Sequence, residues 1–199
     1  MPEEVNLDIS SNTLYYSKRF NQHGIDSYPN ILIESIKGGI MGREYSISKE
    51  RMLEILQETK CVYDDIDFSH EPGSDYIHFR ANQVFRLDTG ATIPGASVVF
   101  RSIKTPGFMR HSLDLRVRHL NVENIVLQIE VLPFDLQHPT HREPGLTLHG
   151  SHLLKATQTI GYDSDTDNWT WFQWLSEFER QTNLQCFGNK YEPFIGELF

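Results

Sequence analysis

Residues 111–131 read HSLDLRVRHLNVENIVLQIEV, and this stretch decides the fold class. Apolar and polar side chains alternate along its first half, which is typical of a strand with one buried face and one charged face. The second half, residues 125–131, repeats the alternation. Because only a polar turn over residues 121–124 separates the halves, the stretch predicts an antiparallel β-hairpin.

The sheet predicted around this hairpin extends over residues 75–155. Shorter segments with strand-like composition precede it at residues 76–79, 83–87 and 96–103. Residues 146–155 alternate again and predict one further strand, on which His149 and His152 point to opposite faces. We expect an antiparallel sheet that either stays open or closes into a barrel-like form.

Two helices are predicted to flank the sheet. The first covers residues 48–60, with Ser48 as its N-cap. The second covers residues 168–182, with Asn168 or Asp167 as its N-cap. Its apolar stripe consists of Trp171, Trp174, Leu175 and Phe178. The pattern predicts an α+β fold in which this tryptophan-rich helix covers one face of the sheet.

Length and composition favour one intracellular domain. The chain has 199 residues, within the range of a single domain, and residues 1–30 are expected to form an arm packed on the body. The sequence contains no signal peptide and no apolar run of roughly 20 residues, so we expect a cytoplasmic protein that is not embedded in a membrane. Cys61 and Cys186 are expected to be reduced thiols.

Charge is distributed unevenly along the chain. The formal net charge is −9, with 27 acidic and 18 basic residues. Acidic residues are concentrated at 64–67 and 163–167, and basic residues gather between Arg101 and Arg118. This balance argues against a surface that is basic throughout, but it leaves room for a local basic groove. It also suits a non-catalytic inhibitor or antitoxin-like protein that binds a basic protein partner.

Histidines are concentrated in one short region. His138, His141, His149 and His152 form two HxxH pairs. Imidazoles converging from a loop and a strand could bind zinc or a related metal. They could equally serve as acid and base near neutral pH, or His152 could be a neutral core residue while His141 and His149 lie at the surface.

The acid–base interpretation gives the sharpest hypothesis. His138-Pro139-Thr140 and His149-Gly150-Ser151 resemble the H-x-[ST] units of two-histidine phosphoesterases, although here they lie close together instead of in separate halves of the chain. Arginines nearby could hold a phosphate. We therefore predict an RNA-directed phosphodiesterase. Its candidate catalytic residues are His141, His149 and His152, and its candidate substrate-binding residues are Arg116, Arg118 and Arg142.

Other chemistries find less support in the sequence. Asp114 and Glu130 could be the acidic pair of a metal-dependent nuclease, but strand carboxylates on an outer face are usually solvated. Trp169, Trp171 and Trp174 could stack bases, although their helical spacing indicates a core role. The sequence contains no phosphate-binding glycine loop, dinucleotide fingerprint or serine-hydrolase elbow, so no cofactor can be named.

Residues 63–186 also resemble an uncharacterised bacterial domain family of small standalone proteins. The resemblance is carried by Arg110-His111-Ser112-Leu113, His141-Arg142-Glu143-Pro144-Gly145 and Gly150-Ser151-His152. These segments form a His/Pro/Gly loop followed by a G-x-H strand. Leu153-Leu154 departs from the pattern, where a polar or histidine position is expected. The resemblance implies a bacterial or phage accessory protein in a toxin-like or defence context.

Overall fold

The computed structural model describes residues 46–70, 73–136, 139–143 and 145–195. The predicted arm over residues 1–30 lies outside these ranges, as does His138 of the first HxxH pair. Neither of the two helices in the described part of the chain is long and apolar enough to cross a membrane.

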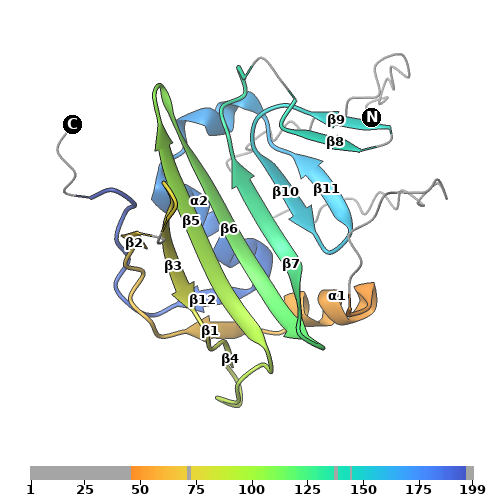
Figure 1. The fold of residues 1–199 in the computed structure, drawn as a ribbon. Helices are drawn as coiled ribbons and strands as arrows, with labels where there is room; N and C mark the ends of the chain where they lie inside the picture. The colour runs from red at the N-terminus through yellow and green to blue at the C-terminus, as the bar shows by residue number, and fades with distance from the viewer. Residues whose placement is uncertain (1–45, 71–72, 137–138, 144, 196–199) are drawn as a thin grey trace, which may run out of the picture.

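A seven-stranded sheet forms the centre of the molecule (Figure 1). Its order is β11-β10-β7-β6-β5-β3-β2, and all neighbouring strands are antiparallel. The strands are β2 (Ser69–His70), β3 (Ile77–Ala81), β5 (Ala96–Thr105), β6 (Phe108–His119), β7 (Val122–Val131), β10 (His152–Lys155) and β11 (Gln158–Gly161). No pairing within the described residues joins β2 to β11, so the sheet is open. The predicted α+β fold with a central antiparallel sheet is confirmed.

The predicted hairpin is the pair β6–β7. Its turn is shorter than expected, because Leu120 and Asn121 alone form it, with φ of 47° and 63°. Two successive positive φ values are the mark of a type I′ turn, whose twist matches that of the flanking strands. The pairing register shifts between Leu115 and Arg116, a bulge that the alternation of the sequence did not reveal.

Helix α2 (Trp171–Thr182) covers one face of the sheet, as predicted. Trp171, Trp174, Leu175 and Phe178 are all buried. The Phe100 ring of β5 packs edge-on against Phe178, with centroids 5.2 Å apart. The tryptophans therefore serve the core instead of an exposed stacking surface.

The N-terminus of α2 differs from the prediction. Its N-cap is Thr170, which forms a capping box with Gln173, and neither Asn168 nor Asp167 has that role. Both of these residues belong to a short 3-10 helix, η1 (Ser164–Asn168). The Asp167 carboxylate instead accepts a hydrogen bond from the backbone N–H of Phe134 at 2.9 Å.

Helix α1 (Lys49–Gln57) begins after Ser48, whose hydroxyl accepts a hydrogen bond from the Arg51 N–H, so the predicted N-cap is confirmed. The helix ends earlier than predicted, because Lys60 already belongs to a strand. That strand is the centre of a second sheet with the order β12-β1-β4. Its strands are β1 (Lys60–Val62), β4 (Phe85–Arg86) and β12 (Leu184–Cys186).

The prediction of a single strand over residues 146–155 is wrong. The segment is divided into β9 (Leu146–Leu148), which pairs only with β8 (His141–Glu143), and β10 in the main sheet. Gly150 separates them with φ of +71°, and a Cβ there would lie 3.0 Å from the Cα of Phe134. A residue with a side chain would therefore be strained at this bend.

Lys60 joins the ends of the two helices. Its side chain is fully buried, and its ammonium group donates to the carbonyl of Glu58 at 2.6 Å and to that of Thr182. These carbonyls stand at the C-termini of α1 and α2, where backbone acceptors lack helical donors and the helix dipole favours a cation. Burial nevertheless lowers the pKa of Lys60 to about 8.

We expect Lys60→Met to destabilise the protein by about 2 kcal/mol, because two buried carbonyls lose their donor while the cost of burying the charge is relieved only in part. Lys49→Met, at the exposed start of α1, is the matched control and should change stability by less than about 0.5 kcal/mol. Urea unfolding at pH 7 measures both. Equal stability of Lys60→Met and the wild-type protein would contradict this role.

His111 makes stability depend on pH. The ring is buried on the α2 side of β6, its Nδ1 lies 2.8 Å from the hydroxyl of Ser102, and burial lowers its pKa to about 4. Below pH 6.5 the unfolded chain binds a proton that the folded protein excludes. The contribution of His111 is therefore complete above pH 6.5 and is lost as the pH falls toward 4.

At pH 5 this group alone should reduce the free energy of unfolding by ~2 kcal/mol relative to pH 7. His111→Gln keeps a polar group beside Ser102 but does not titrate, so its unfolding free energy should fall less over the same interval. Urea titrations of both proteins at pH 7 and pH 5 test this. Parallel losses in the two proteins would show that His111 is not the group responsible.

Candidate functional site

The face of the sheet opposite α2 carries a row of polar side chains that crosses several strands. His152 of β10 pairs with Glu130 of β7, and Glu130 pairs with Ser112 of β6. The same row continues through Arg101 of β5 to His78 of β3. Since residues paired across neighbouring strands point to the same side of a sheet, these side chains share one surface.

Glu130 is the centre of the candidate site. One carboxylate oxygen accepts a hydrogen bond from Nη2 of Arg110 at 3.2 Å, and the other lies 3.4 Å from Nε2 of His152. The carboxylate thus links a guanidinium from β6 to an imidazole from β10. Arg110 remains substantially exposed, with 40% of its side chain accessible, so the guanidinium can also meet an external anion.

His152 is the buried histidine of this group. Burial is the main cause that lowers its pKa, and His141 acts in the same direction, while the Glu130 carboxylate opposes both. The imidazole is therefore neutral at pH 7. His152 is neutral and buried, as the interpretation of a neutral core residue requires. It does not belong to the apolar core, however, because it lies on the opposite face of the sheet beside charged and polar neighbours.

His141 lies beside His152 and is only half-buried. The two ring centroids are 5.1 Å apart, and the ring planes are tilted by 49°. His141 belongs to β8, so the small β8–β9 ribbon carries this imidazole to the edge of the main sheet (Figure 1). The result is a histidine pair in which one ring is accessible and the other is held by a carboxylate.

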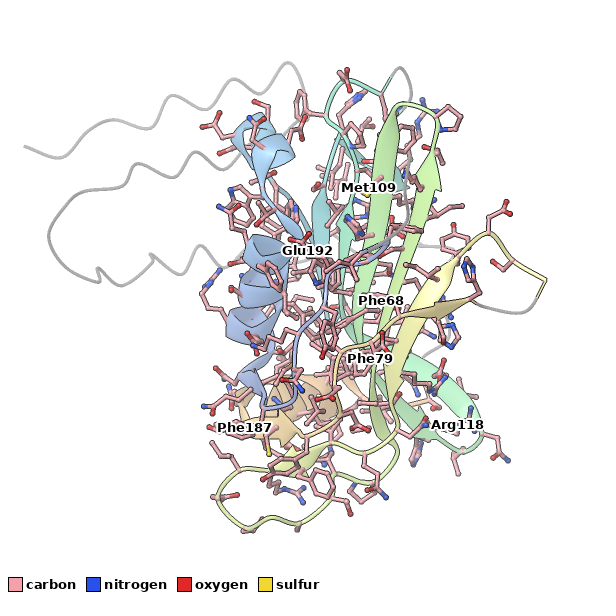
Figure 2. The ribbon with its side chains drawn as sticks, turned by 90° about the vertical axis from the view of Figure 1, so that its left-hand side faces the viewer. Phe68, Phe79, Met109, Arg118, Phe187 and Glu192 are labelled. Carbon is pink, nitrogen blue, oxygen red and sulfur yellow. The ribbon has the colours of Figure 1, made fainter. Side chains whose placement is uncertain are left out.

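The remaining predicted site residues are less closely associated with this pair. His149 lies in the bend after β9, with its ring 6.4 Å from that of Phe134. Arg142 is exposed on β8, next to His141 in sequence. Arg118 is at the far end of β6, with its side chain 63% exposed and 3.9 Å from Glu123. It lies on the side of the sheet that faces away from α2 (Figure 2).

Arg116 is held in a separate network. It is buried, and its guanidinium donates to Asp114 at 3.0 Å from Nε and to Glu123 at 2.7 Å. It lies four residues beyond Ser112 on β6, which places it about 13 Å along the strand from the histidine row.

Arg110 is a site residue that the sequence did not single out. The signal was present, because Arg110 alternates with Ser112 and Asp114 and therefore lies on the same face of the strand.

The two carboxylates considered for a metal-dependent nuclease are each bound to an arginine. Asp114 pairs with Arg116, and Glu130 pairs with Arg110. In the part of the chain that the structure describes, no three His, Cys, Asp or Glu side chains are arranged to hold a metal ion.

Comparison with known proteins adds no relative: no protein-family model, no curated protein and no solved structure matches the chain. The resemblance to an uncharacterised bacterial family remains a prediction from the sequence segments that carry it. All three segments contribute to the site: residues 110–113 supply Arg110, residues 141–145 supply His141 and residues 150–152 supply His152.

Removal of the Glu130 charge should change the titration of His152. Because the carboxylate opposes the effect of burial, Glu130→Gln should lower the pKa of His152 below its wild-type value. Asp88→Asn, in an exposed loop, is the control and should leave it unchanged. Histidine ring chemical shifts followed by NMR across pH give both midpoints. An unchanged or higher midpoint in Glu130→Gln would contradict the described contact.

Proposed function

We propose that the protein is an RNA-directed phosphodiesterase whose reacting group is His141. The observation that supports this most is the accessible imidazole of His141 beside a neutral His152, which is in turn held by Glu130. A neutral neighbour matters because a protonated one would repel the charge that His141 gains when it accepts a proton. The pair is therefore suited to proton transfer near pH 7.

The chemistry follows from the groups that the site offers. His141 takes the proton of a ribose 2′-hydroxyl, whose oxygen attacks the adjacent phosphorus. As the bond from phosphorus to the 5′ oxygen breaks, His141 returns the proton to that leaving oxygen. The products are a 2′,3′-cyclic phosphate and a free 5′-hydroxyl, so atoms and charge balance. Only RNA supplies the attacking hydroxyl, which selects it over DNA.

One arginine can bind the phosphate during this reaction. Arg110 is next to the histidine pair through Glu130, whereas Arg142, the residue after His141 on β8, projects from the opposite face of that strand. A guanidinium can donate two parallel hydrogen bonds to phosphate oxygens and stabilises the charge that develops on them. His152 acts as a positioning residue because its ring lies beside that of His141, and Glu130 acts through His152, which it holds. This activity fits the toxin or defence context that the sequence resemblance implies.

The test is cleavage of a labelled RNA by the full chain and by single variants. We expect His141→Ala to lose about 10²–10⁴-fold in rate, which is the usual contribution of a general acid–base group. His149→Ala is the matched control, because it removes a histidine near the same ribbon whose ring lies beside Phe134. It should retain activity and the same melting temperature.

A second arm separates this chemistry from metal-dependent cleavage. The proposed reaction uses a proton carrier and an arginine, so the rate should be the same with and without EDTA. His152→Gln should shift the pH profile instead of abolishing the rate, as expected for a residue that acts through His141. Absence of cleavage by the wild-type protein, or equal rates for His141→Ala and wild type, would refute the proposal.

A further inference from the structure

Three aromatic rings lie together on the second sheet, two of them exposed and stacked and the third half-buried. Tyr63 follows β1, Phe85 belongs to β4 and Phe187 follows β12. The Tyr63 ring lies 5.6 Å from each of the other two, and its plane is within 21° of that of Phe187. Tyr63 is 60% exposed and Phe187 53% exposed. We call these three residues the aromatic patch.

The sheet register places the aromatic patch on one continuous surface. Cys61 pairs with Phe85 on one side and with Gln185 on the other, so Tyr63, two residues after Cys61, and Phe187, two residues after Gln185, share its face. Cys61 itself is buried. Grouped aromatic side chains that remain this exposed commonly mark an interaction site.

An open acidic groove adjoins the aromatic patch. It has a volume of about 690 Å³, and Tyr63 lines it together with Asp64, Asp65 and Asp67. Within the described residues, no lysine or arginine forms an ion pair with these carboxylates. Arg80 also borders the groove, but its guanidinium is bound to Glu123 at 2.8 Å.

We propose that the aromatic patch and the acidic groove form a docking site for a basic peptide segment of a partner protein. Carboxylates in the groove complement lysine or arginine side chains, and the exposed ring faces of Tyr63 and Phe187 can bind cations or apolar side chains. A segment that combines basic with apolar residues satisfies both parts of the surface. A nucleic acid does not, because its phosphates would meet the carboxylates.

This docking site goes beyond the proposed RNA-cleaving function and does not depend on it. In Figure 1 the strands β1, β4 and β12 lie at the lower left, and β8 and β9 lie at the upper right. A change at the aromatic patch should therefore leave the rate of RNA cleavage unaltered, so each proposal can fail alone.

The experiment selects ligands from a library of short random peptides displayed on phage, with the full-length protein as bait. We expect the selected peptides to be enriched in lysine or arginine together with apolar residues. One such synthetic peptide is then measured by fluorescence anisotropy against the variants. Tyr63→Ala/Phe187→Ala should weaken its binding at least about tenfold, as expected for exposed aromatic anchors.

The charge arm uses Asp64→Asn/Asp67→Asn, which preserves side-chain size and should also weaken binding and its dependence on salt. Leu120→Ala, in the exposed β6–β7 turn, is the control and should bind as the wild-type protein does. The proposal is overturned if selection yields no peptide, yields peptides without basic residues, or yields peptides that bind the variants equally well. If the wild-type protein self-associates and Tyr63→Ala/Phe187→Ala does not, the patch binds a second copy of the chain. That result would also overturn the proposal.

Discussion

The buried charge of Asp114 constrains the open face of the sheet. This carboxylate is fully buried on the side opposite α2, where a lone charge would be strongly unfavourable. Ser112 donates to one of its oxygens at 2.7 Å, and Arg116 donates to the other. Arg116 also binds Glu123, which binds Arg80 of β3. The network therefore joins side chains of β3, β6 and β7 across the face opposite α2.

This network orders the side of the sheet opposite α2, where the described part of the chain places no helix. Apolar residues at alternate positions of β5, β6 and β7 pack beneath α2, and intervening positions of β6 and β7 carry the ion pairs. The same surface continues to Glu130 and Arg110, next to the ribbon that brings His141 beside His152. The candidate site therefore lies at the end of a hydrogen-bonded polar surface, which suits the positioning of a reacting imidazole.

The sequence predicted those features that depend on local patterns. Alternation over residues 111–131 predicted the central hairpin, and Ser48 and the apolar stripe of residues 171–178 predicted both helices. What it could not predict depends on contacts between distant segments. The bend at Gly150 is enforced by Phe134, and the burial of Lys60 requires two helix ends to meet at one point.

The candidate site likewise combines features that the sequence predicted with features that depend on contacts between distant segments. A cluster of histidines was visible in the sequence, but the association of His152 with Glu130 results from the pairing of β10 with β7, which no local signal specifies. Arg116 was predicted to bind the substrate, yet the structure uses it to neutralise Asp114, while Arg110 on the same strand face binds Glu130. Charged residues on one strand face can therefore serve different purposes a few residues apart.

Proton transfer by His141 to and from RNA would determine the chemical ends of the cleaved RNA, so these ends are the measurement to make. Mass spectrometry of the products from a short oligoribonucleotide should show a 2′,3′-cyclic phosphate on one fragment and a 5′-hydroxyl on the other. A single 2′-deoxy substitution should block cleavage at that linkage alone. Fragments that carry a 5′-phosphate, or cleavage at the 2′-deoxy linkage, would contradict the account.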